Sequence, residues 1–250
     1  VVSARARNTG VTTHIVRLFA IVVEKGFELD EGDPARKYKG RVVIQGNNVK
    51  DQNHEAALFN ELSSSPATME AAKLADTVGL FQGFTTEQAD APQAYTQELF
   101  RGTPTWVELP REAWPDSWVK ADYRRPCCPL RLALYGHPDS GGYWERFCER
   151  QVMKAGFVKV PNWRSTYFDA KREAILTIYV DDFKLAAPVD KIKGIWADLK
   201  ANIILDEPKP SDKYLGCDHK ITRVTLPENE FVNVIEYDME GFLQKCIDNY

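Results

Sequence analysis

The sequence predicts an α+β fold in which an antiparallel sheet is packed against helices. Residues 84 to 205 follow the order strand, helix, strand, strand, helix, strand, which is the split β-α-β order of a ferredoxin-like sheet. Two apolar runs rich in β-branched residues flank Asp181-Asp182 and predict a β-hairpin with both carboxylates at its turn. A chain of 250 residues with 44% hydrophobic content is long enough for one large domain or two closely packed subdomains.

The N-terminal part predicts an arm, a strand pair and a helix. Residues 1–10 show no apolar periodicity, so we expect them to be a frayed arm. Residues 21–25 and 41–44 are expected to be antiparallel strands joined by a polar loop. Ser65-Pro66 combines an N-cap with proline at the first helical position, and apolar residues then recur at helical spacing up to Val78.

The middle of the chain predicts a strand ending in an acidic residue, followed by further short elements. Residues 84–89 are expected to be a strand that places Asp90 at its end, with a helix starting after Pro92. Residues 106–110 are expected to be a short strand. One helical face is formed by Trp144, Phe147, Cys148 and Val152, with Gly156 as the C-terminal stop.

The C-terminal part continues the alternation of strands and helices. Residues 167–168 and 173–180 are expected to be strands that precede the Asp181-Asp182 turn. Four apolar residues at i, i+3, i+4 and i+7 predict a helix from Ile192 to Leu199, and residues 203–205 a further strand. A last antiparallel pair is predicted at 214–221 and 231–237, followed by a helix capped by Asp238.

Composition indicates a globular protein without a membrane span. No apolar run approaches the ~20 residues that cross a bilayer, and no signal peptide opens the chain, so we expect an intracellular protein. Five cysteines lack paired metal-ligand spacing, which argues against zinc and a disulfide framework. The net charge of -4 argues against a uniformly basic nucleic-acid surface. Two basic clusters, at residues 36–41 and 120–131, are either phosphate-facing or simply solvated.

The carboxylates at the hairpin turn are the first candidates for chemistry. Two negative charges between buried strands are costly unless a positive charge neutralises them, and a divalent cation would do so. A solvated turn is the alternative, because Asp is a favoured turn residue. Asp90 likewise has a local explanation as a helix N-cap. Adjacent strand residues point to opposite faces, so Asp181 and Asp182 do not suit the matched acid/base pair of a glycosidase.

The tetrapeptide Tyr179-Val180-Asp181-Asp182 resembles the catalytic motif of reverse transcriptases. Four further blocks, at residues 36–46, 87–97, 132–144 and 214–217, occur in the family's order and are similar to the copia-type retrotransposon branch. The resemblance extends from about residue 21 to the end of the chain.

This resemblance implies reverse-transcriptase fingers and palm, the palm being a ferredoxin-like antiparallel sheet with packed helices. In that arrangement residues 1–20 are an N-terminal arm and 21–83 a fingers-like subdomain. Residues 84–250 are palm-like, with a fingers segment at about 104–140. Together they form one reverse transcriptase domain.

The resemblance also implies a site. Asp90, Asp181 and Asp182 would hold two Mg²⁺ ions, for which Mn²⁺ can substitute, and would catalyse transfer of a deoxynucleotide to a primer 3′-hydroxyl. The nucleotide-binding residues would be Lys39, Arg41, Gln93, Ala94, Tyr95 and Asp139. Tyr95 would lie under the incoming sugar and exclude a 2′-hydroxyl. Without the resemblance, a lone tyrosine more commonly fills the core. Lys39 and Arg41 are two positions apart and project from the same face of the predicted strand. That face could bind a triphosphate, or the two cations could protect an edge strand from pairing with another chain.

Two positions depart from the family pattern. Gln45 replaces a frequent arginine, and Asp139 replaces the glutamine that packs against the nucleotide. These changes favour the alternative of a catalytically inactive polymerase-like domain that serves as a nucleic-acid-binding or structural module. A ferredoxin-like RNA-binding module is disfavoured because the expected glycine and aromatic stacking block is absent.

The implied partners are an RNA template, a DNA primer, dNTPs and the RNase H and integrase regions of the same polyprotein, with no membrane. The implied location is a cytoplasmic retrotransposon particle or the nucleus.

Overall fold

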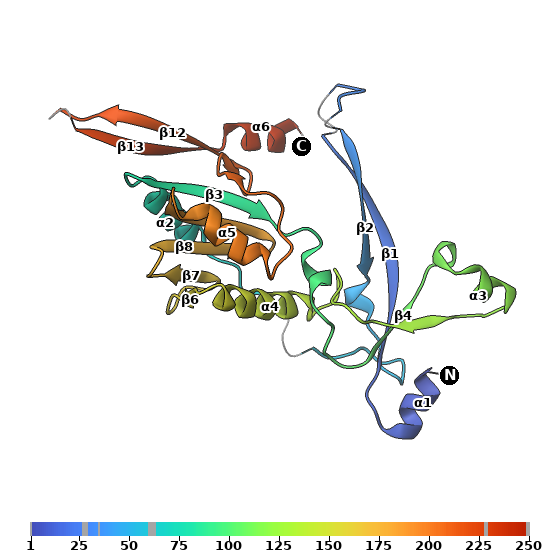
Figure 1. The fold of residues 1–250 in the computed structure, drawn as a ribbon. Coiled ribbons are helices and arrows are strands. Elements are labelled where there is room, and N and C mark those ends of the chain that lie inside the picture. Colours follow the sequence, from blue (N-terminus) through green and yellow to red (C-terminus); the bar gives the residue numbers. More distant parts are fainter. Residues whose placement is uncertain (1, 27–29, 35, 60–63, 228–229, 249–250) are drawn as a thin grey trace. The chain divides into compact units, whose positions relative to one another are not determined.

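The computed structural model describes residues 2–26, 30–34, 36–59, 64–227 and 230–248. It divides into two compact units. Unit 1 comprises Val1–Ser64 and Tyr95–Trp144, and unit 2 comprises Ser65–Ala94 and Glu145–Tyr250. Helices and strands occur in both units (Figure 1), so the chain has the α+β class that the sequence predicts.

Unit 1 contains a four-stranded sheet in the order β2-β1-β4-β5. The elements of unit 1 are α1 (Val2–Thr9), β1 (His14–Lys25), β2 (Lys37–Ile44), β4 (Thr105–Glu108), α3 (Asp116–Lys120) and β5 (Cys127–Pro129), with short 3₁₀ turns η1 (Gly46–Asn48) and η3 (Arg111–Ala113). Strand β1 pairs antiparallel with β2 and parallel with β4. The core of this sheet is formed by Val16, Ile44, Val49 and Val107.

Two expectations for the N-terminal part were wrong. Residues 2–9 form helix α1, which buries Ala6 and is held by a hydrogen bond from Arg7 Nη1 to the Gln52 carbonyl (3.0 Å). Strand β1 begins at His14 rather than residue 21, because its first residues pair with β4. Propensity does not reveal either contact, since Gln52 lies 45 residues from Arg7 and Thr105 of β4 lies 91 residues from His14 in sequence.

Unit 2 contains the elements α2 (Met69–Gly79), β3 (Phe84–Asp90), most of α4 (Ser140–Lys154), β6 (Val158–Lys159), β7 (Thr166–Asp169), β8 (Ala174–Tyr179), β9 (Asp182–Pro188), α5 (Ile192–Lys200), β10 (Lys209–Pro210), β11 (Lys213–Tyr214), β12 (Cys217–Thr225), β13 (Phe231–Asp238) and α6 (Glu240–Asp248). A six-stranded sheet has the order β10-β3-β9-β8-β7-β6, and all neighbours are antiparallel. Strands β11, β12 and β13 form a second sheet.

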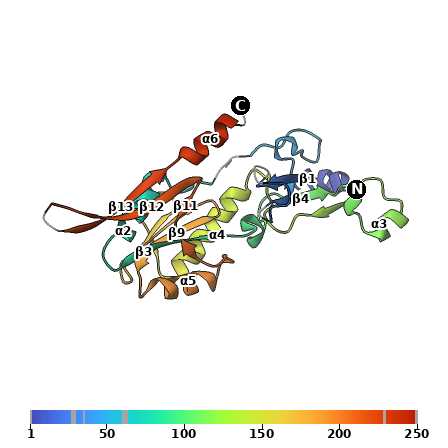
Figure 2. The same cartoon turned by 90° about the horizontal axis from the view of Figure 1, so that it is seen from above.

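Helices α2 and α5 lie on opposite faces of the six-stranded sheet (Figures 1 and 2). On one face, Ala75 of α2 packs with Ile175 and Ala186. On the other face, Glu87 of β3 and Trp196 of α5 line a common cavity. Every second residue of a strand points to the same face of the sheet. Asp182, four positions before Ala186 in β9, therefore lies on the α2 face.

Three predicted elements in unit 2 differ from the structure. The strand predicted at 214–221 is divided into β11 and β12, because Leu215 and Gly216 have positive φ and form a turn between them. Helix α2 begins at Met69 rather than Pro66, because the Thr68 hydroxyl caps it by accepting the Ala71 N–H (3.3 Å). Residues 203–205 form no strand, and the sheet edge is instead β10. Ile203 and Leu205 are buried, so their apolar character reflects packing against the core rather than pairing in the sheet.

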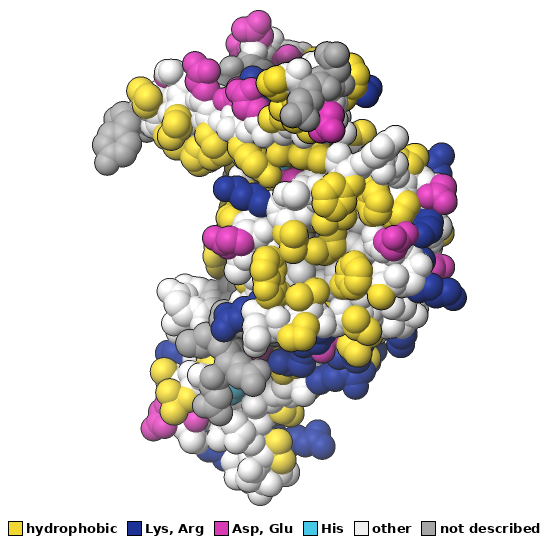
Figure 3. Space-filling model, turned by 90° about the vertical axis from the view of Figure 1, so that its left-hand side faces the viewer, with side chains coloured by type: hydrophobic (Ala, Val, Ile, Leu, Met, Phe, Trp, Pro, Cys, Tyr) yellow, Lys and Arg dark blue, Asp and Glu magenta, His cyan; other side chains and the backbone are white. Residues whose placement is uncertain are grey.

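The ends of the β3–β9 ladder differ in character. One end is the pair Asp90↔Asp182, and the other is Phe84↔Pro188. Phe81 and Val189, which flank the second pair, are more than half exposed. Figure 3 shows hydrophobic side chains gathered on the face of the molecule at this end.

No described helix is both long and apolar enough to cross a membrane.

Candidate active site

Two of the three candidate aspartates face each other across the sheet of unit 2. Asp90 is the last residue of β3 and Asp182 is the first residue of β9, and the two are register partners. Opposite residues in an antiparallel pair project to the same face with Cα atoms about 4.5–5.5 Å apart. Residues 92 positions apart in sequence therefore present their carboxylates side by side.

The third candidate, Asp181, lies in the turn between β8 and β9. Tyr179 and Asp182 are paired, so the two-residue turn consists of Val180 and Asp181. The sequence prediction of a hairpin is confirmed, but its placement of both aspartates in the turn was wrong by one residue. Val180 has a φ of 58°, a conformation that is strained for a β-branched residue. Asp181 has no positive φ, so the turn follows the type II′ pattern.

Backbone hydrogen bonds hold both strand ends in place. The Asp181 carbonyl accepts the Ala91 N–H (2.8 Å), which ties the turn to the chain leaving β3. The Asp90 carbonyl accepts the Asp206 N–H (2.9 Å), which ties β3 to the segment leading into β10. The acidic end of the sheet is thus fixed from both sides.

The carboxylate of Asp182 lies in an unfavourable environment for negative charge. Burial, and then the nearby charges of Asp181 and Asp90, raise its pKa to about 6, against a smaller lowering effect of Lys209. Asp182 is half-buried and Asp90 is exposed. Added positive charge at this end of the sheet would be stabilising.

Lys209 is a site residue that the sequence analysis missed. It lies in β10, opposite Gln88 of β3, and its ammonium is the cation that acts on Asp182. A single lysine in a two-residue strand carries no motif. Only the pairing of β10 with β3 reveals its position.

The donor set fits a hard divalent cation. Three carboxylates from one sheet end provide oxygen ligands only, which Mg²⁺ prefers, and Mg²⁺ commonly uses one or two carboxylates with water and phosphate for the rest. Among the described residues, no three or more His, Cys, Asp or Glu side chains already converge as a metal-binding cluster. Asp90, Asp181 and Asp182 are therefore candidate ligands on the basis of their chemistry and charge.

The segment after β3 differs from the helix that the sequence predicts. Residues 94–97 form one 3₁₀ turn, η2 (Ala94–Gln97). Gln93, just before it, has a φ of 51°, and Ala94 is buried. The left-handed residue interrupts any longer helix that would start at Pro92.

The remaining nucleotide-binding candidates belong to unit 1. Lys39 and Arg41 are both exposed on β2, opposite Val23 and Ile21 of β1, so they share one face of this strand pair. Asp139 is half-buried, and its N–H donates to His137 Nδ1 (3.2 Å).

Tyr95, also in unit 1, is half-buried and stacks on Tyr135, with ring centroids 4.5 Å apart. Tyr95 therefore packs against one aromatic neighbour but is not fully buried in the core.

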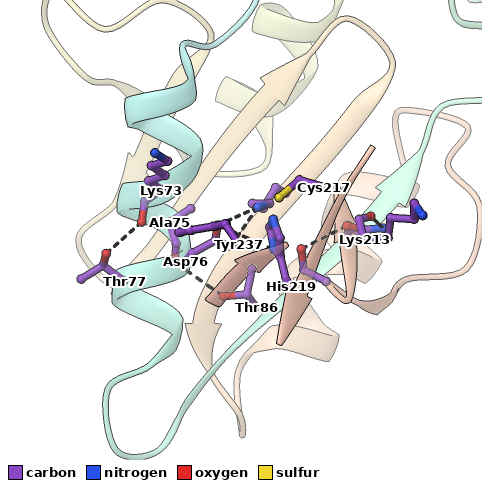
Figure 4. Close-up of polar contacts among 12 residues, drawn as sticks. Lys73, Ala75, Asp76, Thr77, Thr86, Lys213, Cys217, His219 and Tyr237 are labelled. Carbon is purple, nitrogen blue, oxygen red and sulfur yellow. Dashed lines mark hydrogen bonds and ion pairs between the residues drawn. The ribbon is translucent and has the colours of Figure 1, made fainter. Parts of the chain in front are cut away.

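A buried ion pair lies on the same sheet face as Asp182, two residues further along β9. Lys184 Nζ contacts both carboxylate oxygens of Asp76 of α2 (2.8 and 2.9 Å), and both side chains are almost fully buried. Tyr237 of β13 donates to the same carboxylate (3.2 Å), and His219 of β12 lies beside it (Figure 4). Burial lowers the pKa of Lys184 although Asp76 opposes this effect. The network joins α2, β9 and the β12–β13 hairpin.

Comparison with known proteins assigns the sequence to a family. The sequence matches no curated protein. The family model of reverse transcriptase (RNA-dependent DNA polymerase) matches residues 23–245, a range that includes Asp90, the strained turn and Asp182. The chain therefore belongs to the reverse transcriptase (RNA-dependent DNA polymerase) family.

Proposed function

We propose that this chain is the polymerase domain of a copia-type retrotransposon, which extends a DNA primer on an RNA template by two-metal nucleotidyl transfer. The observation that carries the proposal is the pairing of Asp90 with Asp182 beside Asp181 in a strained turn. Strain of about 1–3 kcal/mol persists where surrounding structure enforces it, often at functional sites.

Unit 2 is proposed to contain the palm. The order β10-β3-β9-β8, with helices between β3 and β8 and between β9 and β10, supports a ferredoxin-like palm. The β1–β2 hairpin of unit 1, with its exposed Lys39 and Arg41, supports a fingers assignment for that segment.

Asp90, Asp181 and Asp182 would hold the metal ions. When bound, two Mg²⁺ ions would activate the primer 3′-hydroxyl and stabilise the leaving pyrophosphate. The protein's own part is to concentrate negative charge at one sheet end, and Lys209 offsets some of the resulting repulsion. Lys39 and Arg41 would bind the triphosphate as cations, Gln93 and Ala94 would offer backbone amides, and Tyr95 would contact the sugar.

A second candidate function rests on Asp139. Its carboxylate stands where the family pattern has a neutral glutamine, and added negative charge opposes binding of a triphosphate. On this account the domain binds nucleic acid or another protein without catalysis. The two functions differ in one measurable respect, because only the first consumes dNTPs.

Primer extension on an RNA template with Mg²⁺ tests the first proposal. We expect dNTP incorporation by wild type and at least a 100-fold loss in D90N and D181N, since each removes a candidate metal ligand. The matched control is D190N, which makes the same chemical change just beyond the opposite end of β9. Lack of incorporation by wild type would support the non-catalytic alternative, and equal rates in D181N and D190N would contradict the role of Asp181 as a metal ligand.

A further inference from the structure

Tyr95 and Tyr135 form a stacked pair within unit 1. Their ring centroids are 4.5 Å apart with an interplanar angle of 34°, and both side chains are half-buried. Aromatic pairs at this separation attract one another beyond the effect of burial. One face of the Tyr95 ring is therefore covered by a second ring.

The backbone at Tyr135 is held against the end of β2. Its carbonyl accepts the Ile44 N–H (2.7 Å). The next residue, Gly136, has a φ of 85°, and a Cβ there would lie 2.1 Å from the Ile44 carbonyl oxygen. Only glycine fits this position. The Tyr135 ring is consequently attached to backbone that cannot shift toward β2.

The backbone at Tyr95 is linked to the same segment. The Tyr95 carbonyl accepts the Glu98 N–H (3.2 Å), and the Glu98 carbonyl accepts the Ala133 N–H (2.9 Å). Phe100 N–H donates to the Arg131 carbonyl (2.9 Å). Backbone hydrogen bonds thus connect the segments that carry the two tyrosines. The relative position of the two rings is therefore fixed by the backbone as well as by the contact between the rings.

We propose that Tyr135 is a positioning residue for sugar selection and acts through Tyr95. The inference rests on the proposed function, in which Tyr95 lies under the sugar of the incoming nucleotide. An aromatic ring excludes an added hydroxyl only if the ring cannot move away from it. Apolar contacts that can move discriminate only weakly against one hydroxyl. Tyr135 fills the space into which Tyr95 would retreat, so it keeps the contact rigid.

The test compares dNTP and rNTP incorporation by the full chain on an RNA template. The measured quantity is the ratio of kcat/KM for dATP to that for ATP, two nucleotides that differ only at the 2′ position. In Y135L this ratio is expected to fall about tenfold, which corresponds to about 1.4 kcal/mol, because Tyr95 gains space to move. Y135F keeps the ring and is expected to keep the wild-type ratio. Y135M serves as a second variant if circular dichroism shows that Y135L is unfolded.

A double-mutant cycle with Y95V separates positioning from general damage. Y95V alone is expected to lower the ratio more than Y135L, and Y135L is expected to add nothing in the Y95V background. An unchanged ratio in Y135L, which includes equal losses for dATP and ATP, or an effect that persists in the Y95V background would overturn the role of Tyr135. If wild type incorporates no dATP, the proposed function itself fails and the inference fails with it.

Discussion

Val180 shows how one residue shapes the candidate site. Its positive φ lets the β8–β9 hairpin close with only two turn residues, so Asp182 becomes the first residue of β9 and the partner of Asp90. Glycine is the usual residue at this turn position. The strained backbone therefore determines which aspartate enters the ladder and which stays in the turn.

At the same scale, removing one charge should stabilise the metal-free protein. We expect D182N to raise the free energy of unfolding in EDTA at pH 7 by about 1–2 kcal/mol, because burial and like charge disfavour the ionised carboxylate. Thermal unfolding monitored by circular dichroism measures the change. Mg²⁺ should stabilise wild type more than D182N. A lower unfolding temperature of D182N in EDTA would contradict this account.

His137 should make the stability of the protein depend on pH. Burial, and then the nearby His14, lower its pKa to about 4 from 6.5. The unfolded state therefore binds more protons between these values, so the free energy of unfolding should fall as pH drops from about 6.5 to 4, by up to about 3 kcal/mol. Its Nδ1 accepts the Asp139 N–H, and its Nε2 is buried without a partner among the described residues.

Denaturant unfolding at several pH values measures this dependence. His137→Asn keeps an acceptor but does not titrate, so subtracting its pH profile from that of wild type isolates His137 from other groups, including His14. If the two profiles run parallel between pH 6.5 and 4, His137 does not contribute.

At the scale of elements, the Asp76–Lys184 pair holds three parts of unit 2 together. Both side chains are buried, and Tyr237 and His219 add contacts from the β12–β13 hairpin. A buried pair is expensive to desolvate, so its contribution to stability is small compared with the cost of breaking it. The pair thereby favours one arrangement of α2, β9 and the hairpin over others.

Single and double substitutions should therefore behave differently. K184M leaves the Asp76 carboxylate buried without its cation and is expected to lower the free energy of unfolding by about 3–5 kcal/mol. The double variant D76L/K184M removes both charges and should recover most of this loss. Urea unfolding of wild type, the two single variants and the double variant gives the coupling energy. Additive losses would show that the two side chains act independently.

At the scale of the whole molecule, the chain has two compact units, and each has apolar packing of its own. Val16, Ile44, Val49 and Val107 form the core in unit 1, whereas Ala75, Ile175 and Ala186 pack between α2 and the sheet in unit 2. Local stability can differ between such units. The acidic end of the β3–β9 ladder and the apolar end at Phe84↔Pro188 both belong to unit 2.

Hydrogen exchange should reveal this division. In K184M we expect faster amide exchange in α2, β9 and the β12–β13 hairpin, and nearly unchanged exchange in β1 and β4 of unit 1. Mass spectrometry of peptic peptides measures both sets in one experiment. Equal acceleration in the two units would mean that they unfold as one cooperative body.

Local patterns were sufficient for much of this fold. The β8–β9 hairpin, the helix from Ile192, the strand ending at Asp90 and the β12–β13 pair all follow from side-chain periodicity and turn residues, which act over a few positions. The start of α2 and the edge strand β10 did not follow from local patterns. Thr68 caps α2, so the helix begins after the position that Pro66 indicates. Ile203 and Leu205 are buried outside the sheet, so their apolar character does not mark a strand. The fingers and palm boundaries and the roles of the candidate residues stay predictions.

By itself, the sequence determined the class of fold, the acidic hairpin and the motif order that identifies the family, because these depend on neighbours along the chain. Only the tertiary structure decided that Asp182 opposes Asp90, that Lys209 and Lys184 lie near this site, and that Tyr135 covers Tyr95. A one-residue change in a turn shifts which side chain enters a ladder. Contacts between residues tens of positions apart arise only when the elements pack, which is why no local pattern contains them.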